Sequence, residues 1–99
     1  MRIIALLLTL LLFSSITIVD LHAQTSGDYE RALKLYKDKR FSDAAEILQR
    51  YIQEKPTPSA YYLLGYALYK MGKHSEAMKY FKEAYLLDPD FKPESIKFK

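Results

Sequence analysis

Apolar and turn-forming positions along the chain repeat at a spacing of 33 residues. The triplet Leu-Tyr-Lys occurs at residues 35–37 and again at 68–70, and Ala44 aligns with Ala77. The other aligned positions are 40–43 with 73–76, Leu48 with Phe81, and Pro56 with Pro89. A period of this size is typical of stacked supersecondary units, each of which buries its apolar face only against a neighbour. The sequence therefore predicts two copies of one structural unit.

Each unit is predicted to contain two helices. In the second unit, the first helix follows from apolar residues at steps of three and four, which is the spacing of one helical face. These residues are Tyr61, Leu64, Leu68 and Met71. Gly72 and Lys73 then interrupt the pattern, and an interruption of this kind predicts a turn.

The second helix of each unit has an apolar stripe that we expect to be buried. The stripes are Ala44, Ala45, Leu48, Tyr51 and Ile52 in the first unit, and Ala77, Met78, Phe81, Ala84 and Tyr85 in the second. Ser42 and Ser75 precede these stripes and are predicted as N-caps, because a serine hydroxyl accepts a hydrogen bond from the first helical turn. Glu76 is favourably placed in that turn. Pro56 and Pro89 are predicted to stop the two helices, because proline cannot continue the helical hydrogen bonds.

The start of the chain has a different pattern. Residues 3–19 contain no charged side chain, and Arg2 precedes them. This arrangement resembles a secretory signal peptide, so we expect cleavage after Ala23 and an exported protein, periplasmic or secreted, with no membrane contact after cleavage. Leu21 stands where a small residue is usual before the cut, which leaves the cleavage position open. The alternative is a membrane anchor formed by residues 3–19, which is near the lower limit of length for spanning a bilayer.

These patterns predict an all-α fold. Two helix-turn-helix repeats would supply four antiparallel helices in a short α-solenoid, preceded by a hydrophobic signal segment. The expected segments are a signal peptide at 1–23, a first repeat at 24–57, a second repeat at 58–91 and a C-terminal tail at 92–99. We expect the end of the chain either to lay Phe91 and Ile96 over the exposed end of the second unit or to lack fixed structure.

Charge and composition narrow the classes of function. The formal net charge is +3, and the basic residues alternate with acidic ones. A nucleic-acid binder more often carries a basic stripe on one face, so we expect no nucleic-acid partner. The chain has no cysteine, which excludes disulfides, thiolate metal sites and cysteine nucleophiles.

Candidate chemistry is sparse. His74 lies beside Ser75 in the predicted turn, and adjacent turn residues rarely give a nucleophile and a base the geometry they need. The chain has no glycine-rich phosphate loop and no metal-ligand spacing. We therefore expect no enzyme, no catalytic residues, no metal and no cofactor.

The second unit resembles the tetratricopeptide repeat family. The family pattern is a large residue, then Leu-Gly and Tyr in the first helix, followed by Ala, Phe and a closing Pro in the second. The matching residues are Tyr61, Leu64, Gly65, Leu68, Tyr69, Ala77, Phe81 and Pro89. The resemblance implies that Gly65 and Ala77 are small because the two helices approach closely there. Phe81 and Leu64 would fill the space around that crossing.

The first unit matches the family pattern less well. Asp28 and Arg31 stand where the family has large apolar residues, as expected of a terminal repeat with one face in water. Two units are also fewer than the three usually needed for independent stability.

The family geometry implies a concave groove, lined by the first helix of each unit, that binds a protein or peptide partner. Helical spacing places two sets of residues on this side. They are Tyr29, Leu33, Tyr36 and Lys37 in the first unit, and Tyr62, Tyr66, Tyr69 and Lys70 in the second. Tyrosine suits recognition because it carries a rigid apolar ring with a hydroxyl at its tip. The alternative is that these rings only pack between neighbouring helices.

Some family members bind a carboxylate-ended peptide through lysine and asparagine. This chain has no asparagine, so we do not expect that activity. We expect an exported adaptor or scaffold that binds another protein. The alternatives are a membrane-anchored scaffold and a structural protein that forms a homo-oligomer through its exposed repeat ends.

Overall fold

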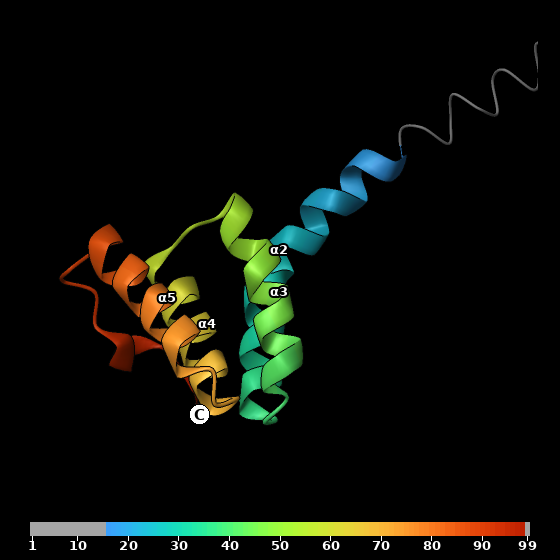
Figure 1. The fold of residues 1–99 in the computed structure, drawn as a ribbon. Helices are drawn as coiled ribbons and strands as arrows, with labels where there is room; N and C mark the ends of the chain where they lie inside the picture. The colour runs from blue at the N-terminus through green and yellow to red at the C-terminus, as the bar shows by residue number, and fades with distance from the viewer. Residues whose placement is uncertain (1–15, 99) are drawn as a thin grey trace, which may run out of the picture.

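The computed structural model describes residues 16–98, with side chains from Gly27 onward (Figure 1). Its helices are α2 (Ile16–Lys37), α3 (Phe41–Glu54), α4 (Pro58–Lys70), α5 (His74–Leu87) and the 3-10 turn η1 (Pro93–Ser95). No strand occurs among the described residues, which confirms the prediction of an all-α fold. Most of the apolar run at 3–19 lies outside the described residues, and its last four residues belong to α2.

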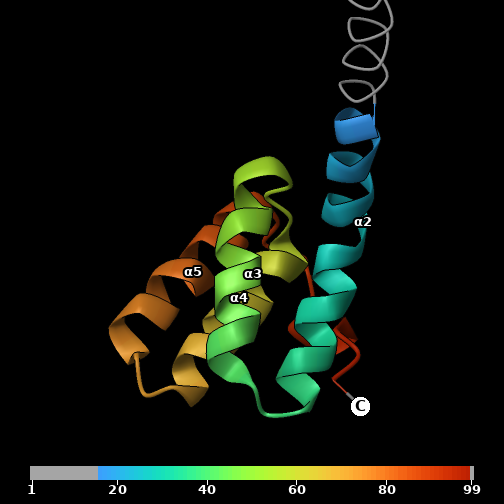
Figure 2. The same cartoon turned by 90° about the vertical axis from the view of Figure 1, so that its right-hand side faces the viewer.

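The helices pack as two antiparallel pairs. α2 pairs with α3, α4 pairs with α5, and α3 also packs along α4 to join the pairs (Figure 2). This is the arrangement expected of a short α-solenoid. The N-terminal part of α2 extends beyond the other helices in both views. Within residues 16–98, no helix combines the length and the apolar character that crossing a membrane requires.

The core consists of leucines separated by alanines. Its largest fully buried side chains are Leu48, Leu63, Leu64 and Leu68. The alanines with no exposed surface are Ala32, Ala44, Ala60, Ala67, Ala77 and Ala84. Alanine brings helix backbones close together, and leucine fills the remaining space at close-packed density. The stripe predicted for the first unit is confirmed, with Tyr51 half-buried and its other four members buried.

The tightest approach within the second pair lies at Gly65 of α4. A Cβ atom added to Gly65 would lie 2.6 Å from Cδ1 of the Phe81 ring on α5 and would clash with it. Ala77 is fully buried at the same pair. The close approach expected from Gly65 and Ala77 is therefore confirmed, and glycine is required because the ring occupies the place of a side chain.

The end of α4 is a Schellman turn. The Lys73 N–H donates to the carbonyl of Leu68 at 2.9 Å, and the Gly72 N–H donates to that of Tyr69 at 3.0 Å. This motif needs one residue in the left-handed region, and Gly72 supplies it with φ of 80°. Glycine adopts this conformation without a Cβ clash, which explains why the helical pattern stops there.

The end of α2 repeats the same turn without glycine. The Arg40 N–H donates to the carbonyl of Leu35 at 2.8 Å, and the Lys39 N–H donates to that of Tyr36 at 3.0 Å. Lys39 takes the left-handed position with φ of 63°. A side chain with a Cβ atom is strained there, so the first unit holds its turn at a higher conformational cost than the second.

The predicted serine caps are wrong. α3 begins at Phe41 and α5 at His74, so Ser42 and Ser75 lie inside the first turns, and both are exposed. The N-caps are Arg40 and Lys73, whose carbonyls accept the first helical bonds at 3.0 Å from the N–H groups of the alanines four residues later. One residue thus closes the preceding turn and opens the next helix, which leaves no position for a serine cap. Glu76 does lie in the first turn of α5, as expected.

The prolines lie just after helix ends, as predicted, and one helix has a threonine as its side-chain N-cap. Pro56 and Pro89 both follow a helix end within two residues, at the ends of α3 and α5. α4 begins with Pro58, and the Thr57 Oγ1 accepts a hydrogen bond from the Ala60 N–H at 3.3 Å. Thr57 is therefore the side-chain N-cap of this helix.

The stripe predicted for α5 is only partly buried. Ala77 and Ala84 have no exposed surface and Phe81 is half-buried, but Met78 is 62% exposed and Tyr85 57% exposed. α5 is the last long helix in the described chain, and no further repeat packs against its outer side. The periodicity predicts an apolar stripe on α5 that is wide enough to pack against helices on two sides. In the fold, a helix packs against one side only.

We expect Gly65→Ala to destabilise the protein even though alanine is the better helix former. The gain in helix propensity is about 1 kcal/mol, whereas forcing extra volume into a packed contact costs about 1–3 kcal/mol. Chemical denaturation should therefore give a lower free energy of unfolding. The matched control is Gly27→Ala on α2, where an added Cβ would meet nothing within 4 Å and should stabilise. In a Phe81→Leu background the cost of Gly65→Ala should shrink or vanish, and an unchanged cost would contradict the assigned contact.

We expect Lys39→Gly to stabilise the protein by about 1 kcal/mol, because the relief of left-handed strain outweighs the entropy of the extra glycine. Thermal unfolding should then rise by several degrees. Gly72→Ala should destabilise by a similar amount, since it introduces the same strain at the equivalent position. A lower melting temperature for Lys39→Gly would show that the turn is held by something other than its backbone conformation.

Candidate functional site

The residues predicted to line a groove lie on one side of α2 and α4. We call this side the α2–α4 face and define it by Tyr29, Leu33, Tyr36, Tyr62, Tyr66 and Tyr69. The first five are half-buried, and Tyr69 is 52% exposed. Lys37 and Lys70 are exposed at the end of the face. The sequence spacing therefore placed the eight residues on the two helices that line one surface, although few of them face open solvent.

Several rings of this face pack inside their own helical pair. The Tyr29 ring lies 6.0 Å from that of Tyr51 on α3, measured between ring centroids. The Phe81 ring lies 6.0 Å from that of Tyr62 and 5.1 Å from that of Tyr66. The same Phe81 ring that occupies the space at Gly65 thus supports the tyrosines of α4 from behind.

The C-terminal tail crosses the same face. The Phe91 ring stacks on that of Tyr62 at 5.6 Å with an interplanar angle of 16°. The Phe98 ring lies 5.1 Å from that of Tyr36 on α2 and 5.5 Å from that of Tyr66 on α4. Of the two expectations for the tail, packing over the second unit and lack of fixed structure, the tail packs: Phe91 lies on the second unit, and Phe98 reaches across the α2–α4 face to the first.

Local turns direct the tail along this path. The Asp90 N–H donates to Oδ1 of Asp88 at 3.0 Å just after α5 ends. In η1, both the N–H and the Oγ of Ser95 donate to the carbonyl of Lys92, at 2.9 and 2.7 Å. Ile96 then follows with an extended backbone and is only 6% exposed. The tail has no long helix of its own, so its position depends on the side chains that it buries.

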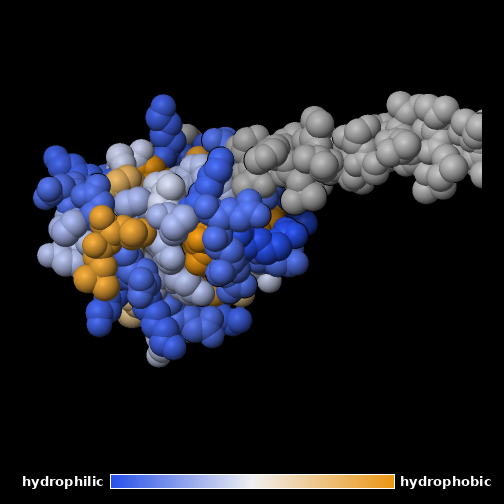
Figure 3. Space-filling model, turned by 90° about the horizontal axis from the view of Figure 1, so that it is seen from above, coloured by the Kyte–Doolittle hydropathy of each residue, from blue (hydrophilic) through white to orange (hydrophobic). Residues whose placement is uncertain are grey.

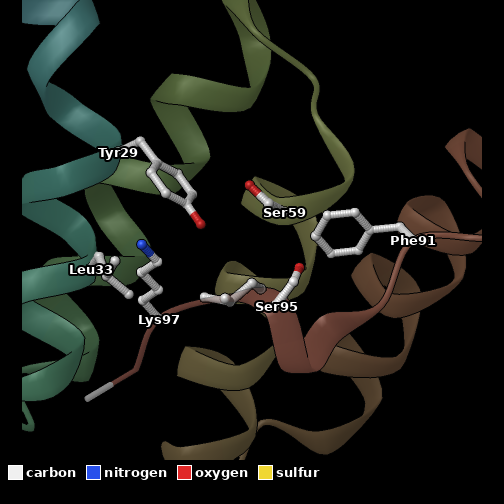
Figure 4. Close-up of a pocket in the computed structure, with 7 residues that line it drawn as sticks. Tyr29, Leu33, Ser59, Phe91, Ser95 and Lys97 are labelled. Atoms are coloured by element: carbon white, nitrogen blue, oxygen red, sulfur yellow. The ribbon is translucent and has the colours of Figure 1, made fainter.

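Two pockets remain on the α2–α4 face. The first has a volume of about 270 Å³ and is lined by Tyr29 and Leu33 of α2, Ser59 of α4, and Phe91, Ser95, Ile96 and Lys97 of the tail. Figure 4 shows Tyr29 and Leu33 on one side, Ser59 and Phe91 on the other, and Lys97 between them. The second pocket, of about 380 Å³, is lined by Tyr36, Tyr66, Tyr69, Lys70 and Phe81. Six of the eight predicted residues therefore line a pocket.

Burial changes the acidity of the central tyrosines. It raises the pKa of Tyr36 above the usual value for tyrosine, and the neighbouring Tyr66 adds a smaller effect. Burial also raises the pKa of Tyr66, followed by the effects of Tyr62 and of Glu94 in the tail. Tyrosine hydroxyls are already neutral at physiological pH and the raised pKa moves their ionisation further from it, so the face offers apolar rings and neutral hydrogen-bonding groups.

The charged groups that line the pockets of this face are two lysines, Lys97 in the first pocket and Lys70 in the second. The ion pairs among the described side chains are Arg31 with Asp28 at 3.4 Å and Arg40 with Asp43 at 2.7 Å, both on the surface. His74 is exposed and stacks on Tyr69 at 4.5 Å. Among the described residues, no three histidines or carboxylates gather in a way that could hold a metal ion. The face can therefore pack against apolar and aromatic groups of a ligand, and its tyrosine hydroxyls can form hydrogen bonds at the edge.

Residues outside the predicted set complete the site. Phe81 supports the face from α5, and Phe91, Ile96 and Phe98 occupy it from the tail. One feature of the sequence indicated that the tail packs: Ile96 and Phe98, separated by one lysine, are apolar side chains in a polar segment. Where these side chains pack could not be read from that signal, because the segment has no helical or strand period.

Comparison with known proteins identifies part of the chain. Residues 58–91 match the family model for the tetratricopeptide repeat. No curated protein and no solved structure matches the chain significantly. The matched segment begins at the first residue of α4 and includes all of α5 and the turn after it. The match therefore supports placing this helical pair in the tetratricopeptide repeat family, whose repeats generally mediate binding between proteins.

Proposed function

We propose that this protein is a non-catalytic adaptor or scaffold that binds a protein or peptide partner on the α2–α4 face. The observation that carries the proposal is the tail, because a non-helical segment already lies on this face and buries Ile96 there to 6% exposure. A surface that holds one short segment of this kind has the shape and chemistry to hold another. The tetratricopeptide match at residues 58–91 supports the same class of function. The proposal requires no cofactor or metal.

The aromatic character of the face favours a partner with apolar side chains. Tyrosine is enriched where binding energy concentrates in interfaces, because it contributes large contact area with few rotatable bonds. Tyr69 is the ring of the face that remains most exposed, and Lys70 lies beside it in the second pocket. We propose that this open end makes the first contact with a partner.

A second candidate function is self-assembly. Met78, Tyr85, Leu86 and Leu87 of α5 are all at least 49% exposed. Figure 3 shows hydrophobic atoms grouped on the side of the molecule that carries α5. In a repeat array this side packs against the next unit, so a second copy of the chain would have a complementary position to fill.

One pair of variants separates the two functions. We expect Tyr69→Ala to weaken partner binding by about 1–3 kcal/mol, as for an interface aromatic, with little effect on unfolding because the ring is half exposed. The matched control is Tyr85→Ala, which removes a ring of similar exposure, 57%, from α5. A partner captured from envelope extract should be identified, purified and measured by titration calorimetry, with light scattering on the same samples. Loss of oligomers in Tyr85→Ala, together with unchanged partner binding by Tyr69→Ala, would favour self-assembly.

We also propose that the protein is exported after cleavage near Ala23. The support is the apolar run at 3–19 and the length of the helix that cleavage would leave. Residues 24–37 of α2 would form 14 residues, against 14, 13 and 14 in α3, α4 and α5. Cleavage would thus bring α2 to the length of the other repeat helices.

Mass spectrometry of the protein recovered from its own cells tests the export proposal. We expect the N-terminus to be Gln24 and the protein to be in the soluble envelope or culture fraction. Intact Met1 in the membrane fraction would instead support the anchor formed by residues 3–19. Replacing Leu8 with Arg interrupts the apolar run and should keep the uncleaved chain in the cytoplasm.

A further inference from the structure

The tail is an internal occupant of the face proposed above as the binding site. Its three anchoring side chains are Phe91 against Tyr62, Ile96 in the first pocket, and Phe98 between Tyr36 and Tyr66. Phe98 contacts rings from both α2 and α4, so the end of the tail bridges the two repeats. A partner on this face would have to occupy the same positions.

The way the tail is held makes it replaceable. The hydrogen bonds donated by residues 90–98 are local, and each closes a turn between Asp88 and Phe98. None of the ion pairs among the described side chains involves it. Three apolar side chains must therefore offset the entropy of ordering the whole segment, and these two terms are of similar size. A segment held in this way exchanges with a competitor of similar chemistry without unfolding the helices.

The tail also indicates what such a competitor looks like. Ile96 has φ of −69° and ψ of 126°, and the Phe98 N–H donates to the carbonyl of Ile96 at 3.0 Å, which closes a tight three-residue turn around Lys97. The Ile96 side chain before this turn is buried and the Phe98 ring after it lies against Tyr36 and Tyr66, while Lys97 remains exposed. The Phe98 position lies between two tyrosine rings, which favours an aromatic side chain because the rings can pack edge to face.

We propose that the α2–α4 face binds a turn-forming segment with an aliphatic residue two positions before an aromatic one, and that residues 96–98 occupy this site until a partner segment of that pattern displaces them. The proposal rests on the proposed function, because it names the kind of partner that the same face takes. The tail then acts as an intrachain competitor that weakens every partner by a constant factor. It also covers apolar rings when no partner is present.

A peptide supplied in trans tests the inference on the full-length chain. The probe is a synthetic peptide of residues 91–99 with a fluorescent label at its N-terminus, followed by anisotropy. The full-length double variant Ile96→Ser with Phe98→Ala should release the tail and bind this peptide at least tenfold more tightly than the parent does. A peptide carrying the same two substitutions should lose this binding. Equal affinity of parent and variant, or equal binding of the two peptides, would overturn the proposal.

Controls separate release of the tail from general unfolding. The matched variant is Met78→Ser with Tyr85→Ala, which makes comparable changes on α5 and should bind the peptide no better than the parent. In the released variant, NMR titration should find the pKa of Tyr36 and Tyr66 lowered toward the usual value for tyrosine, because burial falls and Glu94 moves away. The pKa of Tyr51 should stay raised, since its burial lies between α2 and α3. If the double variant unfolds, Phe98→Leu replaces it with the same expectation.

Partner measurements keep this inference distinct from the proposed function. A purified partner should bind the released variant more tightly than the parent by the same factor as the peptide. A partner that binds both equally would overturn the competing role of the tail and leave the proposed function standing. Peptide binding as expected, with no partner competing for the site, would instead count against the proposed function and support the tail as a purely structural occupant.

Discussion

The close approach of α4 and α5 at Gly65 is the constraint on which the rest of the structure depends. Because α4 has no side chain at this position, the Phe81 ring of α5 enters the space beside its backbone. The ring then lies behind Tyr62 and Tyr66 and holds them toward α2. A larger residue at Gly65 would displace the ring and, with it, the tyrosines that the tail contacts. One contact therefore fixes both the packing of the second pair and the surface proposed to bind a partner.

The tail covers a face of the molecule on which no other helix packs. Two stacked units leave two sides without a neighbour, which are the α2–α4 face and the outer side of α5. The tail covers much of the first and buries Ile96 there, whereas Met78 and Tyr85 remain exposed on the second. In a longer array, further repeats would cover the outer side of α5. The tail thus adds apolar burial on the α2–α4 face, which a further repeat would lengthen and not cover.

The connections between paired helices are short because one residue serves both helix ends. Arg40 and Lys73 each donate the N–H that closes one helix and provide the carbonyl that begins the next. Sharing one residue between a Schellman turn and an N-cap fixes the angle between the paired helices and leaves no flexible loop. The same geometry forces Lys39 into the left-handed region at the place where Gly72 stands in the second unit. The two units therefore share a backbone although they differ in how easily their sequences adopt it.

Periodicity in the sequence was sufficient for the fold of the described chain. The 33-residue repeat predicted two helical pairs, and in the structure Tyr36, Tyr62 and Tyr66 lie on one side of α2 and α4, while their role as a groove stays a prediction. These features are local, because a helix fixes the direction of every side chain relative to its neighbours three and four positions away. Ser42 and Ser75 were misassigned because the exact start of a helix depends on the hydrogen bonds of the preceding turn.

Only the tertiary structure decided which apolar positions found a partner. Met78 and Tyr85 have the spacing of buried residues and are exposed, while Ile96 and Phe98 belong to no periodic pattern and are buried or half-buried. Burial is a property of the neighbours that a fold brings together from distant parts of the chain. The number of repeats and the path of the tail set those neighbours, and neither can be read from the period of a single helix.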